Sequence, residues 1–237
     1  MASPLSDLLP YVLQHVPSCT DTQAETAILE TVIDFYQRAA LYSVDLDPID
    51  VVADQAEYDL TNPDGFQIQH VRSGLISTYE LLATSEEQLD LNWKDLNCGF
   101  TWRYDYDGVF DGPMPPDSWR HAVSPIPGLV YTPTPNVARL VGIPTEDIDA
   151  ALILKVVCYP TQAIEEIDDW IYNRYWQVLR DGAVGKLKSM TNKPYTDLRT
   201  ATDYSDKYED GVIIAHGAAL RSYQRNDRPH LRTRSFR

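Results

Sequence analysis

Apolar side chains recur every three or four residues in the segment that ends near Tyr42. Ile28, Val32 and Phe35 follow this spacing, which is typical of an amphipathic helix with one apolar face. Thr22-Gln-Ala-Glu25 has the spacing of a capping box, so we expect the helix to begin there. We interpret the apolar face as part of a core, with a partner-facing surface as the alternative.

The middle of the chain changes from a helical period to alternation. Gln67-Ile-Gln-His-Val-Arg72 alternates apolar and polar side chains, as a half-buried strand does. Asn62-Pro-Asp-Gly65 is a turn signal that separates this strand from an earlier one. We expect the first three predicted strands to pair with one another as an antiparallel meander. The predicted strands are residues 44–52, 57–60, 67–72, 128–132, 136–141 and 152–159.

Two long helical patterns fill most of the last quarter of the chain, over Asp168–Met190 and Asp197–Gln224. Asn192-Lys-Pro-Tyr195 interrupts them, so we predict a helical hairpin. Small residues on the second helix lower helix propensity, and close helix packing, within or between subunits, is a reason to keep them. The residues that we assign to helix packing are Tyr175, Trp176, Tyr208, Gly211, Ala215 and Ala219.

These elements predict an α+β fold, in which N-terminal and C-terminal helices form a bundle or hairpin with an inserted antiparallel β-rich region. Residues 1–42 and 160–224 form the helical part, residues 43–159 the β-rich region, and residues 225–237 an extended C-terminal arm. Residues 97–127 are rich in Gly, Pro, Asp and aromatic side chains, and we interpret them as a contact loop or small insertion. The contact residues that we assign to this loop are Trp102, Tyr104, Tyr106 and Phe110.

The formal net charge of −15 is unevenly distributed along the 237 residues. Residues 1–150 contain 24 acidic and 6 basic residues, whereas residues 225–237 contain five arginines and one aspartate. An acidic body repels a phosphate backbone, which argues against a protein that reads nucleic acid. We expect the arm to be disordered alone, and its guanidinium groups to suit bidentate bonds with carboxylates of a partner.

No pattern of a known catalytic, cofactor or metal site occurs in the sequence. The five histidines lack HxxxH or HExxH spacing, and no nucleophile elbow or nucleotide-binding glycine pattern is present. The acidic clusters at residues 45–54 and 105–112 lack the order of an EF-hand loop, and turns between strands explain both. We therefore expect no catalytic residue, no cofactor and no metal. A hydrolase that uses the aspartates is the remaining enzymatic alternative.

The three cysteines, Cys19, Cys98 and Cys158, are widely spaced, which favours free thiols in a reducing compartment. The N-terminus lacks the basic region of a secretory signal. The most apolar run, Ala150–Cys158, contains Lys155 and is far shorter than the ~20 residues that span a bilayer. We therefore expect a protein that is made and used in solution.

Several weak motifs occur in an order that resembles a known family. The first half contains Leu8-Leu-Pro-Tyr-Val-Leu13, Val16-Pro-Ser-Cys19, Phe35-Tyr36 and Tyr58-Asp-Leu-Thr-Asn-Pro-Asp-Gly65. The last third contains Trp170-Ile-Tyr172, Tyr175-Trp176, Gly182-Ala-Val-Gly-Lys-Leu187 and Lys193-Pro-Tyr195, before a small-residue helix and an arginine-rich end. This order is similar to that of the head-to-tail adaptor, or connector, proteins of tailed bacteriophages. The resemblance covers both ends of the chain but not residues 83–144.

The resemblance implies a virion protein that is made in the host cytoplasm and assembles at the head-to-tail junction. Identical subunits would form a dodecameric ring between the portal protein and the next tail component, a nozzle or tube. The acidic body fits a channel through which DNA passes without specific binding. The strand-rich part, with its contact loop, would face the tail component, and the arm would grip the portal. The residues assigned to the portal contact are Arg225, Arg228, Leu231, Arg232, Arg234, Phe236 and Arg237.

The alternative from a different class is a carbohydrate-binding or ligand-binding module associated with a phage tail. Aromatic side chains in the middle of the chain motivate this alternative, because sugar rings stack on exposed aromatic faces. The side chains concerned are Trp93, Trp102, Tyr104, Tyr106 and Trp119. A stable monomer that binds glycans would favour this module over a ring-forming adaptor.

Overall fold

The computed structural model describes residues 2–91, 118–121, 123–124 and 126–224. The described chain divides into two compact units. One unit holds the residues up to Tyr42 together with those from Tyr159 onward, and the other holds those from Ser43 to Cys158. The structure mixes helices and strands and contains a curled sheet, which confirms the predicted α+β class.

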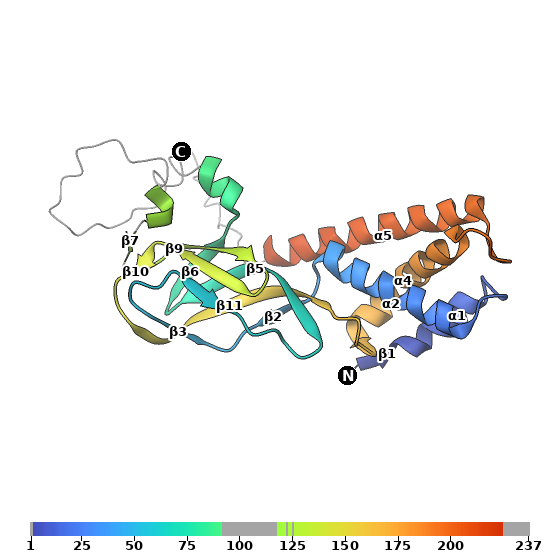
Figure 1. The fold of residues 1–237 in the computed structure, drawn as a ribbon, viewed down its shortest axis with the longest axis horizontal. Helices are drawn as coiled ribbons and strands as arrows, with labels where there is room; N and C mark the ends of the chain where they lie inside the picture. Colours follow the sequence, from blue (N-terminus) through green and yellow to red (C-terminus); the bar gives the residue numbers. More distant parts are fainter. Residues whose placement is uncertain (1, 92–117, 122, 125, 225–237) are drawn as a thin grey trace, which may run out of the picture. The chain divides into compact units, whose positions relative to one another are not determined.

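The first unit is mainly helical, and its elements are coloured blue at the N-terminal end and orange to red at the C-terminal end (Figure 1). Its long helices α2, α4 and α5 pack against one another. Two short strands, β1 and β12, pair antiparallel. The elements are β1 (Ala2–Pro4), η1 (Leu5–Leu8), α1 (Leu9–Leu13), α2 (Asp21–Ala39), β12 (Glu166–Asp168), α4 (Asp169–Ser189) and α5 (Leu198–Gln224).

Helix α2 has the predicted apolar face but a different beginning. Ile28, Val32 and Phe35 are fully buried, which confirms the core interpretation. The hydroxyl oxygen of Thr20, rather than that of Thr22, accepts a hydrogen bond from the first turn, from the backbone N–H of Gln23 at 3.4 Å. The capping-box prediction was therefore wrong by two residues, because a second cap-forming threonine lies just upstream of the first.

Helices α4 and α5 form the predicted hairpin, and their bounds agree with the prediction to within one residue at each end. The Asp197 carboxylate accepts a hydrogen bond from the backbone N–H of Thr200 at 3.2 Å, which satisfies an orphan donor in the first turn of α5. The connecting turn is held by Tyr195, whose hydroxyl donates to the side-chain oxygen of Gln23 on α2 at 3.0 Å. This bond ties the turn, at one end of the hairpin, to the third long helix.

The second unit is built on one large sheet with a short helical turn at residues 86–91. The strands of this sheet are β2 (Ser43–Asp45), β3 (Ile49–Val51), β4 (Glu57–Asp59), β5 (Phe66–Ile76), β6 (Tyr79–Ala83), β8 (Leu129–Thr134), β9 (Val137–Val141) and β11 (Ile148–Pro160). The remaining described elements are η2 (Ser118–His121), β7 (Val123–Ser124) and β10 (Ile143–Pro144).

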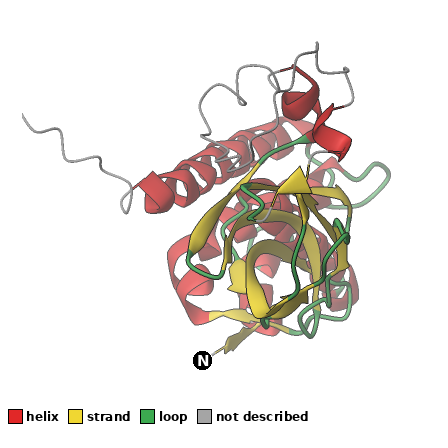
Figure 2. Ribbon diagram, turned by 90° about the vertical axis from the view of Figure 1, so that its left-hand side faces the viewer, coloured by secondary structure: helices red, strands yellow, loops and turns green. Residues whose placement is uncertain are grey.

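The strands of the large sheet lie in the order β2-β11-β5-β6-β8-β9-β4, and β3 also pairs with β11. Figure 2 shows how the sheet curls. The predicted meander was wrong, because β2 pairs with β11 and β4 pairs with β9 rather than with their neighbours in sequence. Alternation specifies that a segment is a strand and which face is buried, but it does not choose the partner strand.

The sheet unit has its own apolar cluster, made of Leu89, Trp119, Leu129, Tyr131 and Val141. Trp119 is only 2% exposed, and its indole N–H donates to the Asp90 carboxylate at 2.8 Å. A large aromatic side chain with a satisfied polar tip is a core residue. Trp119 is therefore not an exposed stacking platform for a sugar, contrary to the glycan-binding alternative.

Candidate assembly surfaces

Two of the three predicted contact regions lie outside the described residues. These are the arm, residues 225–237, and the four aromatic residues of the contact loop, Trp102, Tyr104, Tyr106 and Phe110. The aspartates of the cluster at residues 105–112 lie outside them as well. The third region, the helix-packing set on α4 and α5, is fully described.

Most of the helix-packing set is buried inside its own subunit. Five of its six members are buried: Tyr175, Tyr208, Gly211, Ala215 and Ala219. A Cβ atom on Gly211 would lie 2.6 Å from both methyl carbons of Val178 on α4. The missing side chain thus permits a close approach of α4 and α5. The sequence left open whether the small residues of α5 permit close packing within one subunit or between two subunits. This geometry favours packing within one subunit.

Tyr208 is the centre of a polar contact between α5 and α2. Its hydroxyl donates to the Asp34 carboxylate at 2.6 Å. Arg38 forms an ion pair with Glu209, with one N–O distance of 2.7 Å, and its guanidinium lies 5.9 Å from the centre of the Tyr208 ring. Burial, followed by the hydrogen bond to Asp34, raises the pKa of the Tyr208 phenol above its usual value. The phenol therefore stays protonated and serves as a donor.

Trp176, the sixth member of the set, is half-buried and packs locally. Its ring centre lies 5.0 Å from that of Tyr11 on α1, and the Arg180 guanidinium lies 5.5 Å from it. Trp170, in the first turn of the same helix, is 47% exposed. The apolar face of α4 is therefore narrower than the aromatic content of the segment indicates.

The outer side of α5 carries an apolar stripe that faces away from the helical core. Ile213, Ile214 and Leu220 are 66%, 62% and 52% exposed. Successive helix residues turn by about 100°, which directs each of these side chains roughly 100–140° away from the buried residues Tyr208 and Ala219. Large apolar side chains gathered on one exposed face are typical of an interaction site. We call these three residues the outer stripe.

The first half of α5 presents a different surface on the same outer side. Asp203, Asp206 and Asp210 are exposed there, and they precede the outer stripe along the helix. The outer side of α5 thus changes from acidic to apolar toward its C-terminal end, after which the basic arm begins at residue 225. The helical period in the sequence could have revealed the outer stripe, because its residues fall outside the apolar face that buries Tyr208.

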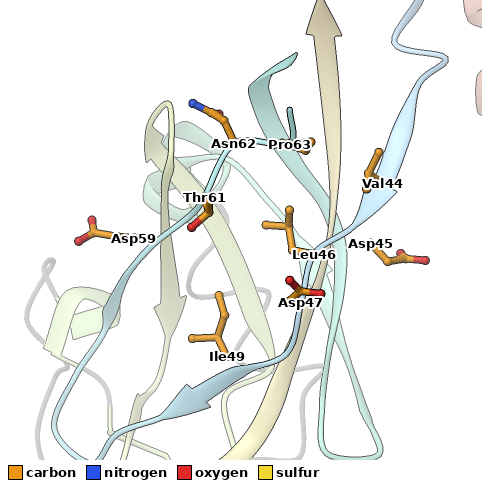
Figure 3. Close-up of a pocket in the computed structure, with 9 residues that line it drawn as sticks. All are labelled: Val44, Asp45, Leu46, Asp47, Ile49, Asp59, Thr61, Asn62 and Pro63. Carbon is orange, nitrogen blue, oxygen red and sulfur yellow. The ribbon is translucent and has the colours of Figure 1, made fainter. Parts of the chain in front are cut away.

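The sheet unit contains a groove between two segments that are distant along the sheet (Figure 3). The groove has a volume of about 310 Å³. One side is lined by Val44, Asp45, Leu46, Asp47 and Ile49, and the other by Asp59, Thr61, Asn62 and Pro63. Figure 3 shows the side chains of Leu46, Ile49 and Thr61 between the two segments. We call this feature the edge groove. The sequence did not reveal it, because it depends on strand pairing.

The acidic cluster at residues 45–54 supports strand edges rather than a metal. Asp50 accepts a hydrogen bond from the backbone N–H of Ala150 at 2.6 Å, and Asp45 lies 3.9 Å from the Lys155 ammonium. Among the described residues, no group of three or more metal-ligating side chains is close enough to hold an ion. The expected absence of a metal, a cofactor and catalytic residues stays a prediction for the chain as a whole.

The histidines within the described chain are scattered. His216 is exposed on α5. His15 contacts α5, where its Nδ1 atom lies 3.1 Å from the Tyr204 hydroxyl. Desolvation, followed by the positive charge of Arg180, lowers the pKa of His15 below its ordinary value of 6.5. The other charges that act on this ring are those of Lys188, Asp181 and Lys207.

His15 should make folding depend on pH. Because its pKa is lower in the folded state than in the unfolded state, its stabilising contribution is present above 6.5 and is lost as the pH falls through the folded pKa. A His15→Asn variant lacks this titration but keeps a side chain that can bond to Tyr204. We expect the melting temperatures of the two proteins to converge as the pH falls from about 7.5 to about 5. A constant difference across this range would contradict the assignment.

In comparisons with known proteins, no family model and no curated protein matches the chain. Each helix in the described part of the chain is too short or too polar to cross a membrane.

Proposed function

We propose that the protein is a structural subunit of a phage head-to-tail junction, where copies assemble as a ring between the portal and the next tail component. The observation that carries this proposal is the outer stripe on α5. A folded monomer gains nothing by exposing two adjacent isoleucines and a leucine on one helix side, whereas an interface between copies would bury them. The resemblance in motif order supplies the type of assembly.

In this proposal the helical unit forms the body of the ring. The buried faces of α2, α4 and α5 hold each subunit together, and the outer stripe makes the contact between neighbouring subunits. The arm that follows α5 attaches the ring to the portal, and the sheet unit faces the nozzle or tube. The acidic residues of the sequence disfavour adhesion of DNA to the channel wall. The protein then resides in the virion after synthesis in the host cytoplasm.

The outer stripe provides the first test of ring formation. A protein with Ile213→Glu and Ile214→Glu should fold normally but fail to form rings in the presence of a portal. Burying each isoleucine stabilises an interface by roughly 2 kcal/mol, and each glutamate instead introduces a charge that must be desolvated. Negative-stain microscopy and analytical ultracentrifugation of the protein with the cognate portal would measure the loss.

Leu198→Glu is a matched control for this test, because Leu198 lies on the same helix and is 61% exposed. A glutamate at Leu198 lies at the N-terminal end of α5, where a negative charge is favourable. We therefore expect this variant to fold and assemble as the wild type does. Normal rings from the double variant would show that the copies meet through another surface. Binding of glycans by a stable monomer would instead support the ligand-binding alternative.

A further inference from the structure

The edge groove lies between the two open edges of the large sheet. Strand β2 begins the strand order and β4 ends it, so within the described residues neither has a further strand on its outer side. Strand β3 continues the first edge along β11. The lining residues come from the segments 44–49 and 59–63, so one side of the groove follows the β2–β3 edge and the other follows the end of β4. The curl of the sheet thus brings two edges to a common groove.

The backbone at both edges is directed so that it can receive another strand. The Leu46 N–H bonds to the Leu154 carbonyl of β11 at 2.8 Å. Because N–H and C=O groups alternate in direction along a strand, the backbone of Asp45 points away from β11. At the other edge, the Leu60 N–H bonds to the Asn136 carbonyl at 2.7 Å, which directs the Asp59 backbone away from β9. An extended segment can therefore bond to these edges by strand addition.

The side chains of the groove define the chemistry of the segment that fits. Leu46 and Ile49 are half-buried, whereas Asp45, Asp47 and Asp59 are exposed. Lys155 is a distant partner for Asp45, and within the described residues no ion pair involves Asp47 or Asp59. Charges on a sheet edge discourage pairing with strands of like charge. The groove therefore favours an extended segment that presents positive charge to both edges and uncharged side chains to Leu46 and Ile49.

We propose that the edge groove of one copy holds the arm of a second copy, as an added strand, when no portal is present. In an extended chain Arg232 and Arg234 share one face, and Leu231 and Thr233 share the other. The two arginine side chains then lie against the acidic edges of the groove. Leu231 and Thr233 lie against Leu46 and Ile49. The 13 residues of the arm extend over roughly 40 Å, which exceeds the length of the groove edges. This contact between arm and groove is separate from the contact that forms the ring. A portal that binds the arm must first displace it from the groove.

A charge-swap experiment tests this contact with the full-length protein and no portal. The acidic side is reversed by Asp47→Lys with Asp59→Lys, one residue from each edge. The basic side is reversed by Arg232→Glu with Arg234→Glu. We expect the wild type to self-associate at low salt in sedimentation equilibrium, each double variant to associate about tenfold more weakly or worse, and the combined protein to recover wild-type association. Glu80→Lys with Glu87→Lys, which alters exposed acids of the same unit outside the groove, should leave association unchanged.

Several results would overturn the proposal. A wild type that stays monomeric at low salt, association that survives reversal of Asp47 and Asp59, or a combined protein that does not recover would each exclude the edge groove as the binding site. Thermal melts of all variants show whether loss of association reflects unfolding. The experiment is repeated with Ile213→Glu and Ile214→Glu, which removes the proposed ring contact. We expect this variant still to associate and its association to weaken as salt is added, because salt screens the charges of the arm and the groove. This result would separate the arm–groove contact from ring assembly.

Discussion

The Gly182→Val variant should unfold at a markedly lower temperature than the wild type. Gly182 lies on α4 where three helices meet, and a Cβ atom there would approach Thr31 Cγ2 of α2 to 2.5 Å and Tyr208 Cδ2 of α5 to 2.6 Å. Both neighbours are buried, so neither can move aside without disturbing the core. We expect a loss of about 3 kcal/mol in unfolding free energy and a fall in Tm of roughly 6–12 °C, measured by calorimetry.

Gly217→Ala is the control for this prediction, because Gly217 lies in α5 where the nearest atom to a new Cβ, Arg221 Nη2, is 3.9 Å away. With room for the methyl group, the substitution removes only the cost of glycine in a helix and should stabilise the protein by about 0.5–1 kcal/mol. Equal melting temperatures for the two variants would mean that α4 does not pack against α2 and α5 at Gly182 as described.

The helices were predictable because a helical period is a local signal. It places the apolar side chains on one face of the helix, and that face becomes buried. The face of α2 that contains Val32 and Phe35 is buried as expected, and the hairpin of α4 and α5 has the expected bounds. The exact helix starts were less predictable, since Thr20 and Thr22 have the same capping chemistry and only the geometry selects Thr20.

The role of the small residues depended on which way they face. Gly211 and Ala215 predicted a close helix approach, and Gly211 does make one, but against Val178 of the same chain. A small residue signals close packing whether the neighbour belongs to the same subunit or to another. The exposed apolar surface of α5 is instead the outer stripe, which consists of large residues, and it is the surface that we propose for the contact with a neighbouring subunit.

Strand pairing was the least predictable feature. The segments near Val44 and Tyr58 do form strands, but their partners, β11 and β9, come about 80 to 110 residues later in the chain. Alternation contains no information about such distant partners, whereas a tight turn would have specified its own hairpin. The edge groove follows from this pairing, because it exists only where two edges of the curled sheet approach.

Deletion of residues 225–237 should abolish stable attachment to the portal and leave the folded subunit intact. The deletion begins after Gln224, where α5 ends, so the truncated protein keeps every described helix and strand of both units. Guanidinium groups suit bidentate bonds with carboxylates, so we expect the five arginines to bind carboxylates of the portal, with Leu231 and Phe236 as apolar anchors. The thermal melt should be unchanged, while co-sedimentation with the cognate portal should be lost.

Replacing the five arginines by lysines distinguishes recognition by guanidinium groups from simple attraction of charge. Lysine keeps the positive charge but lacks the planar pair of donors, so this variant should attach more weakly than the wild type and more tightly than the truncated protein. Ordering the arm on the portal costs conformational entropy, which the bidentate bonds and the two anchors must outweigh. Docking of the truncated protein with unchanged affinity would place the portal contact elsewhere, with the helical hairpin as the remaining candidate.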